Sequence, residues 1–322
     1  MECENRTALH EFVLMGIPHP EGLHVPLFLF FVIIYLLTIT GNILVLLAVG
    51  SEPQLHKPMY WFLCHLSILN MAMSTVIVPK VISGFLEGGR VISVGGCKTQ
   101  LFFYHFLGST ECFLYTVMAY DRFLAICKPL HYYATMSPRV CLCLSLGAWL
   151  GGSLHSTLET TLTFYLPYGT RNEIYYIFCD IPALLKLACV DTKFNEMFTF
   201  VDVGLVAMVC IVLILMSYVY ILSTILKIHS VEGQRRAFST CAAHIIVVMT
   251  CYVPLAFNYL RPGAQDLLGR IVAIFYTTLT PFLNPLIYTL RNKEMKEAML
   301  RLREKMNHSE DARIDPQQNV TI

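Results

Sequence analysis

An acidic and a basic residue, Asp121 and Arg122, stand side by side near the end of a long apolar run that begins close to Cys97. Charged side chains at membrane depth are costly, so they pair with one another or mark functional sites. Asp121 can hold Arg122 in a charge-assisted pair. The alternative is an ordinary helix end, stopped by Pro129, whose long charged side chains reach the membrane surface.

Two further acids lie inside apolar runs. Glu111 is deep within the run that precedes Arg122, and Asp202 follows the start of a later run. Ionisable residues at such depth are functional-site hypotheses by default. Asp202 could face lipid near the headgroups or the interior of a helix bundle. We favour the interior, where His105 and Ser109 can supply hydrogen bonds. A carboxylate there favours ligands with a hydrogen-bond donor and rejects carboxylic acids.

The composition requires a membrane environment for these groups. The chain has 322 residues, of which 56% are hydrophobic and 14% are charged, and its formal net charge is +1. These fractions are too apolar for an ordinary soluble domain, and the charge gives no reason to expect nucleic acid as a partner. We therefore expect a single domain embedded in the lipid bilayer. No cationic segment precedes an apolar core at the N-terminus, so no cleaved signal peptide is expected.

Seven apolar runs are each long enough to span a bilayer. They cover residues 26–49, 59–81, 98–123, 140–162, 197–226, 237–259 and 271–290. The predicted fold class is an all-α membrane protein, a seven-transmembrane helix bundle with a short amphipathic cytoplasmic helix after the seventh span. The expected parts are an extracellular N-terminus (1–25), the seven-helix domain (26–290), the amphipathic helix (291–305) and a polar, disordered cytoplasmic tail (306–322).

Lysine and arginine residues set the expected orientation. They are more numerous in the tail and in the links on the same side of the membrane as the tail. By the positive-inside rule, this side is cytoplasmic and the N-terminus is extracellular. The sequon at Asn5 is then open to glycosylation, whereas the sequons at Asn307 and Asn319 stay unmodified.

The stretch MAYDRFLAICKPLHYY (118–133) closely resembles the MAYDRYVAICxPLxY signature of the olfactory receptors, a branch of the rhodopsin-like G-protein-coupled receptors. Phe123 stands where that family usually has tyrosine. Further matching motifs follow the family order: LHKPMY (55–60), VPK (78–80), AFSTCAAH (237–244) and NPLIY (284–288). The short link 261–270 resembles the tetrapod-type class.

The resemblance implies a receptor in the plasma membrane. Such a receptor binds small volatile organic ligands within the bundle and activates a stimulatory, olfactory-type heterotrimeric G protein, which raises cyclic AMP. Asp121 and Arg122 are then the cytoplasmic switch. Tyr218 and Tyr288 resemble the tyrosines that close around this arginine in active receptors, although aromatic anchoring at the membrane interface would also explain them.

The resemblance also implies a disulfide bond between Cys97 and Cys179. Both cysteines fall on the extracellular side, where disulfides persist. The bond would tie the third helix to the long loop over the bundle. Gly169 replaces a cysteine that the family often has, so Cys189 lacks its usual partner. Cys189 could be free or could pair elsewhere, for instance with Cys3.

The ligand site is expected in the outer third of the bundle. Tyr104, Gly108 and Cys112 recur every four residues and share one helix face, with His105 and Ser109 in the adjacent row. By analogy with the family, later helices contribute Asp202, Val203, Val206, Tyr252, Leu255, Ala256, Tyr259, Ile274, Thr277 and Thr278. Ordinary helix packing is the competing interpretation for each of them.

Four polar residues, Asn42, Asn70, Glu111 and Asn284, are expected to converge at the middle of the bundle. Rhodopsin-like receptors often hold sodium there, and the family usually has aspartate at the position of Asn70. With one acid remaining, we expect weaker sodium binding or a protonated Glu111, and we assign no metal.

Two other classes were weighed. A seven-span transporter tends to show internal repeats and broken helices in matching halves, and the sequence has no such repeat. An intramembrane enzyme would need a catalytic constellation, yet the spans carry no His-Asp pair, GxSxG or HExxH motif. We expect neither enzymatic activity nor a cofactor.

Overall fold

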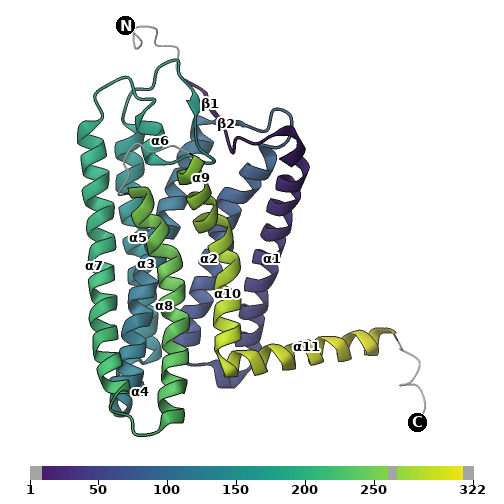
Figure 1. The fold of residues 1–322 in the computed structure, drawn as a ribbon, viewed down its shortest axis with the longest axis vertical. Coiled ribbons are helices and arrows are strands. Elements are labelled where there is room, and N and C mark those ends of the chain that lie inside the picture. Colours follow the sequence, from purple (N-terminus) through teal and green to yellow (C-terminus); the bar gives the residue numbers. More distant parts are fainter. Residues whose placement is uncertain (1–8, 260–266, 315–322) are drawn as a thin grey trace.

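The computed structural model describes residues 9–259 and 267–314, and these form a bundle of long, roughly parallel helices (Figure 1). Six long helices are α1 (His24–Ser51), α2 (Pro58–Ser83), α3 (Val94–Cys127), α5 (Pro138–Phe164), α7 (Lys193–Ile225) and α8 (Val231–Tyr259). The seventh span is divided into α9 (Leu267–Ile274), a π-helical turn (Phe275–Leu279) and α10 (Thr280–Arg291). The predicted seven-helix bundle is confirmed. Each span extends beyond its apolar run at one or both ends, and α8 begins six residues earlier than predicted.

Among the described residues, six spans are long and apolar enough to cross a membrane. The exception is α3, which has 34 residues but carries buried polar side chains such as Gln100, His105 and Glu111. This helix packs against α2, α5, α7 and α8. Neighbouring helices rather than lipid surround it, which is why its polar side chains are tolerated.

Small residues let α5 approach α3 closely. Ala148, Gly152 and Ser156 recur every four residues and are buried. A Cβ atom added at Gly152 would lie 2.2 Å from the Thr110 Oγ1 atom, and the Ser156 hydroxyl donates a hydrogen bond to the Phe102 carbonyl. Close approach at small residues is a common basis of helix association in membranes.

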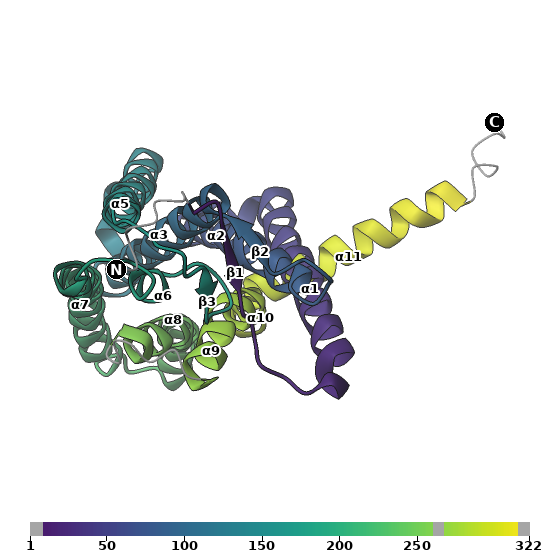
Figure 2. The ribbon, with the colours of Figure 1, turned by 90° about the horizontal axis from the view of Figure 1, so that it is seen from above.

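A small β-sheet covers the outer end of the bundle. Strand β1 (Glu11–Leu14) pairs antiparallel with β2 (Val91–Ser93) and parallel with β3 (Glu173–Ile174), and from above it crosses the bundle (Figure 2). Phe12 is fully buried and makes an edge contact with the ring of Tyr168. This sheet was not predicted, because β1 is four residues long and lies in a polar segment.

The predicted disulfide bond between Cys97 and Cys179 is confirmed, with Cα atoms 5.5 Å apart. Beside it, the backbone N–H of Cys179 donates to Oε1 of Gln100 at 2.9 Å. The long loop then continues into the short helix α6 (Ile181–Leu185). Cys189 is also disulfide-bonded, so a free thiol at this position is excluded.

Helix α11 (Lys293–Ile314) follows the seventh span and projects sideways from the bundle (Figures 1 and 2). The predicted end at residue 305 is too early, because a helix that has already formed extends at little cost. Residues 306–314 are therefore helical rather than disordered, and the rest of the predicted tail lies outside the described residues.

Buried contacts and ion pairs attach α11 to the bundle. Met295 and Ala298 are fully buried. Glu52, just after α1, lies 2.8 Å from the Lys305 ammonium and 3.3 Å from the Arg301 guanidinium. The hydrogen bond from Lys305, with help from both positive charges, holds the pKa of Glu52 below its usual range.

Candidate functional site

A cavity, called the outer cavity below, lies between α3, α5, α7, α8 and the π-helical turn, beneath the β-sheet and the long loop. Its free volume is about 40 Å³, which is room for a few water molecules. The lining residues are Tyr104, His105, Gly108, Ser109, Cys112, His155, Val203, Val206, Ala207, Leu255 and Tyr276. Eight of these were predicted from the sequence; His155, Ala207 and Tyr276 were not.

Several predicted ligand residues do not line this cavity. They are Asp202, Tyr252, Ala256, Ile274, Thr277 and Thr278, and the side chain of Tyr259 lies outside the described part of the chain. Thr277 is fully buried and donates to the Ala273 carbonyl instead. The π-helical turn accounts for this arrangement in the seventh span, because such a turn shifts the register of the side chains. As a result, Tyr276 lines the cavity.

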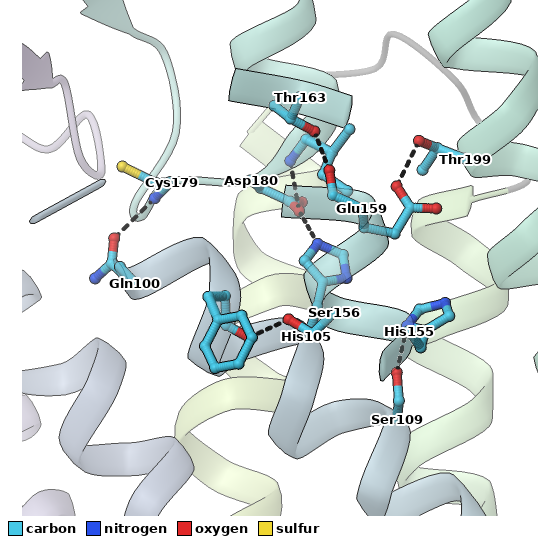
Figure 3. Close-up of polar contacts among 12 residues, drawn as sticks. Gln100, His105, Ser109, His155, Ser156, Glu159, Thr163, Cys179, Asp180 and Thr199 are labelled. Atoms are coloured by element: carbon cyan, nitrogen blue, oxygen red, sulfur yellow. Dashed lines mark hydrogen bonds and ion pairs between the residues drawn. The ribbon is translucent and has the colours of Figure 1, made fainter. Parts of the chain in front are cut away.

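One wall of the cavity is polar. Ser109 on α3 and Nδ1 of His155 on α5 are 2.9 Å apart (Figure 3). On the other edge of the imidazole, Nε2 is 3.0 Å from Oδ2 of Asp202 on α7. Asp202 therefore faces the interior of the bundle, as expected. However, its contact is with His155 rather than with His105 or Ser109. His155 was recognisable only as a polar residue within an apolar run.

The long loop forms the roof of the cavity. Nε2 of His105 lies 3.6 Å from Oδ1 of Asp180 (Figure 3). The same carboxylate accepts from the backbone N–H of Ile181 and so caps α6. Next to this contact, the rings of Tyr104 and Phe178 are 4.6 Å apart. With the disulfide bond, these contacts fix the loop over the cavity.

Tyr276 connects the cavity to the middle of the bundle. Its hydroxyl donates to Oε2 of Glu111 at 3.1 Å, while the hydroxyl of Tyr115 donates to Oε1 at 2.6 Å. Both oxygens of this buried carboxylate are thus satisfied by tyrosines. A ligand that moves Tyr276 would remove one of the two donors to Glu111.

The asparagines extend this network, as predicted. Asn284 donates to Oδ1 of Asn70 at 3.0 Å and to the Tyr115 hydroxyl at 3.5 Å. Asn70 donates in turn to Oδ1 of Asn42 at 3.1 Å. Neutral amides thus bond to one another at the place where the family usually has a second carboxylate.

A second, larger cavity of about 670 Å³, called the inner cavity below, opens at the opposite end of the bundle. Its lining includes Asp121, Arg122, Tyr132, Glu232 and Arg235. The expected ion pair between Asp121 and Arg122 is not formed. Asp121 instead accepts a hydrogen bond from the Tyr132 hydroxyl at 2.8 Å, and the buried Nε of Arg122 has no hydrogen-bond partner. Tyr132 lies after the end of the helix, so its return to Asp121 could not be predicted from helical spacing.

The two predicted switch tyrosines, Tyr218 and Tyr288, are buried. The hydroxyl of Tyr218 lies 2.7 Å from Nδ1 of His244 on α8, and the two rings stack. His244 is fully buried. His244 was not predicted as a site residue and stood only as the last residue of a matching motif, although a histidine inside an apolar run is itself a sign of function.

An outer cavity, a polar network across the bundle and an inner cavity around an arginine are together the features of a seven-helix receptor of the rhodopsin-like, G-protein-coupled class. The olfactory receptor family model matches residues 31–305. The chain is 57% identical to human olfactory receptor 10G6, over 94% of this chain and 91% of that receptor. It is 55% identical to human olfactory receptor 10G9, over 93% and 96% of the two chains. The chain belongs to the olfactory receptor family, whose members are multi-pass proteins of the plasma membrane.

Proposed function

We propose that this odorant receptor binds small volatile organic molecules in the outer cavity and activates a stimulatory heterotrimeric G protein, which raises cyclic AMP. One observation carries the proposal. Tyr276 lines the mainly apolar outer cavity and also donates a hydrogen bond to the carboxylate of Glu111 at the middle of the bundle, so it connects the ligand site to the buried polar network. The transporter alternative has no support from the olfactory receptor relatives.

The lining of the cavity suggests the ligand chemistry. Val203, Val206 and Leu255 form apolar walls, while Ser109 and His155 form a polar end. Apolar walls with a few orienting polar groups are typical of small-molecule sites. Because the carboxylate of Asp202 contacts His155, the polar end favours alcohols, phenols and amines over carboxylic acids.

Activation requires that a movement of Tyr276 in the outer cavity alters the helix positions around Arg122 in the inner cavity. Displacement of Tyr276 by a ligand would weaken the network around Glu111 and shift the seventh span against α8, with which α9, the π-helical turn and α10 are all in contact. Outward movement of α8 would then separate Tyr218 from His244. Arg122 becomes available to the G-protein α-subunit, and Tyr218 and Tyr288 are placed to surround it.

The orientation that this mechanism needs has the N-terminus outside and α11 in the cytoplasm. Asn5, Asn307 and Asn319 lie outside the described residues or have undescribed side chains. We expect glycosylation at Asn5 alone, so that Asn5→Gln removes the glycosidase-sensitive mobility shift and Asn307→Gln does not. If Asn307→Gln removed the mobility shift instead, the C-terminus would be extracellular and the proposed orientation would be wrong.

A pair of glycine variants tests the position of the ligand. At Gly108 an added Cβ would lie 3.4 Å from the Tyr276 hydroxyl, whereas at the exposed Gly147 it would meet nothing within 4 Å. Gly108→Val places additional methyl groups in the cavity, so it should raise the EC50 of an agonist in a cyclic AMP assay by about tenfold or more. Gly147→Val should leave the EC50 unchanged at equal surface expression. Equal EC50 values for the two variants would show that the ligand does not bind in this cavity.

A further inference from the structure

Three potential metal-binding side chains meet beside the outer cavity. His155 and Glu159 are four residues apart on α5 and therefore share a face, and Asp202 approaches them from α7. Their candidate ligand atoms all lie within 4.8 Å of one another. Histidine pairs or histidine-carboxylate pairs with this spacing are a common helical half-site for metals.

The polar atoms that face one another in this cluster are only partly satisfied. Oε1 of Glu159 is buried and forms no hydrogen bond. Nε2 of His155 and Oδ2 of Asp202 are also buried and have only each other as partners, 3.0 Å apart. Glu159 is fully buried. An unpaired buried polar atom costs free energy, and a buried charge costs more. The three ligand atoms converge within 4.8 Å of one another and leave Oε1 of Glu159 without a partner, which points to an occupant that binds all three.

Outer hydrogen bonds orient two of the three side chains. Ser109 bonds Nδ1 of His155, which leaves Nε2 directed at the carboxylates (Figure 3). The hydroxyl of Thr199 donates to Oε2 of Glu159 at 2.8 Å, which leaves Oε1 free (Figure 3). Metal ligands are usually held in this way by a second layer of hydrogen bonds.

The charges point to a divalent cation. Two carboxyl groups and an imidazole carry two negative charges when both carboxyl groups are deprotonated, and among the described residues neither carboxyl group forms an ion pair with lysine or arginine. A divalent cation would neutralise both charges. Because an imidazole is one of the ligands, a transition metal suits the site better than magnesium or calcium.

We propose that His155, Glu159 and Asp202 bind a zinc ion between α5 and α7. Three protein ligands leave a fourth tetrahedral position for water or for a donor atom of a ligand. Because His155 lines the outer cavity, the ion would form part of the polar end of that cavity. The alternative occupant is a proton shared by the carboxylates of Glu159 and Asp202.

Direct binding tests this inference without an agonist and without G-protein coupling, so its result is separate from that of the proposed function. Zinc binding to the full-length receptor, purified in lipid nanodiscs, is measured by competition with a chromogenic chelator. We expect one tight site in the parent, weakened at least about tenfold by Glu159→Gln or Asp202→Asn. Thr199→Val, which removes an outer hydrogen bond, should weaken binding by about tenfold.

Two controls address folding and other zinc ligands. Asp202→His replaces one ligand with another and should retain tight binding, which shows that loss in Asp202→Asn is not misfolding. His10→Ala changes an exposed histidine outside the cluster and should not affect affinity. If the parent binds zinc no more tightly than the combined variant His155→Ala, Glu159→Gln, Asp202→Asn, the inference is wrong and the carboxylates share a proton.

Discussion

Substitution of Gly152 by alanine tests the packing that positions the polar end of the cavity. The new Cβ would lie 2.2 Å from Thr110 Oγ1, 2.9 Å from the Phe106 carbonyl oxygen and 3.0 Å from the Thr110 backbone nitrogen. Two of these atoms belong to the backbone and cannot rotate away. The Thr110 hydroxyl is itself held by its 2.7 Å hydrogen bond to Phe106. Helices α3 and α5 must therefore move apart.

The expected cost follows from overpacking. Extra carbon atoms in a closely packed interior destabilise proteins by about 1–3 kcal/mol, and each kcal/mol lowers the melting temperature by about 2–4 °C for a chain of this order of size. Gly152→Ala should thus lower the apparent melting temperature by several degrees. Separation of the helices would also lengthen the Ser109–His155 contact and raise the EC50 of agonists bound at the polar end.

Thermal unfolding of the purified receptor measures this effect through a thiol-reactive dye. Buried free cysteines such as Cys112 and Cys251 become reactive only when the bundle opens. Gly147→Ala is the matched control, because no atom lies within 4 Å of its added Cβ. Its melting temperature should equal or exceed that of the parent, since alanine favours a helix more than glycine does. Equal melting temperatures for the two alanine variants would refute the close contact between α3 and α5.

Three further predictions concern the network and the tether of α11. Tyr276→Phe leaves Oε2 of Glu111 without its donor, so it should destabilise the receptor by about 1–3 kcal/mol and change basal cyclic AMP; an unchanged melting temperature and basal signal would contradict the link. Asn70→Asp adds a second midplane carboxylate and should make the agonist EC50 depend on sodium, whereas the parent should respond equally in sodium and in N-methylglucamine. Glu52→Gln should speed hydrogen exchange in α11. Because Lys305 lowers the pKa of Glu52, the parent tether should persist at pH 6–7 and loosen only as the pH falls through that lowered value.

The seven spans could be predicted because their cause is the composition of each run, and the disulfide bond because of the family resemblance. A run of about 20 apolar residues has few alternatives to a membrane helix. The pairing of Cys97 with Cys179 followed from the resemblance to olfactory receptors, and the expected extracellular position of both cysteines agrees with it. The same holds for the midplane network, in which Asn42, Asn70 and Asn284 had to find partners inside the bundle.

The details of the cavity could not be predicted because they depend on helix register and on contacts between distant helices. Tyr276 was missed because a π-helical turn leaves no clear trace in the sequence. The contact of Asp202 with His155 depends on how α5 packs against both α3 and α7, and the small residues around Gly152 set only the approach to α3. Tyr132 reaches Asp121 only after the chain has turned beyond Pro129.

The claim that ligand binding in the outer cavity is transmitted to Arg122 is tested most directly by agonist-driven cyclic AMP in cells that express Arg122→Ala. An agonist is first identified with the parent receptor from a broad panel of volatile compounds. The account predicts that Arg122→Ala reaches the cell surface in normal amounts and gives no cyclic AMP response to that agonist. A full response from a normally expressed Arg122→Ala receptor would contradict it.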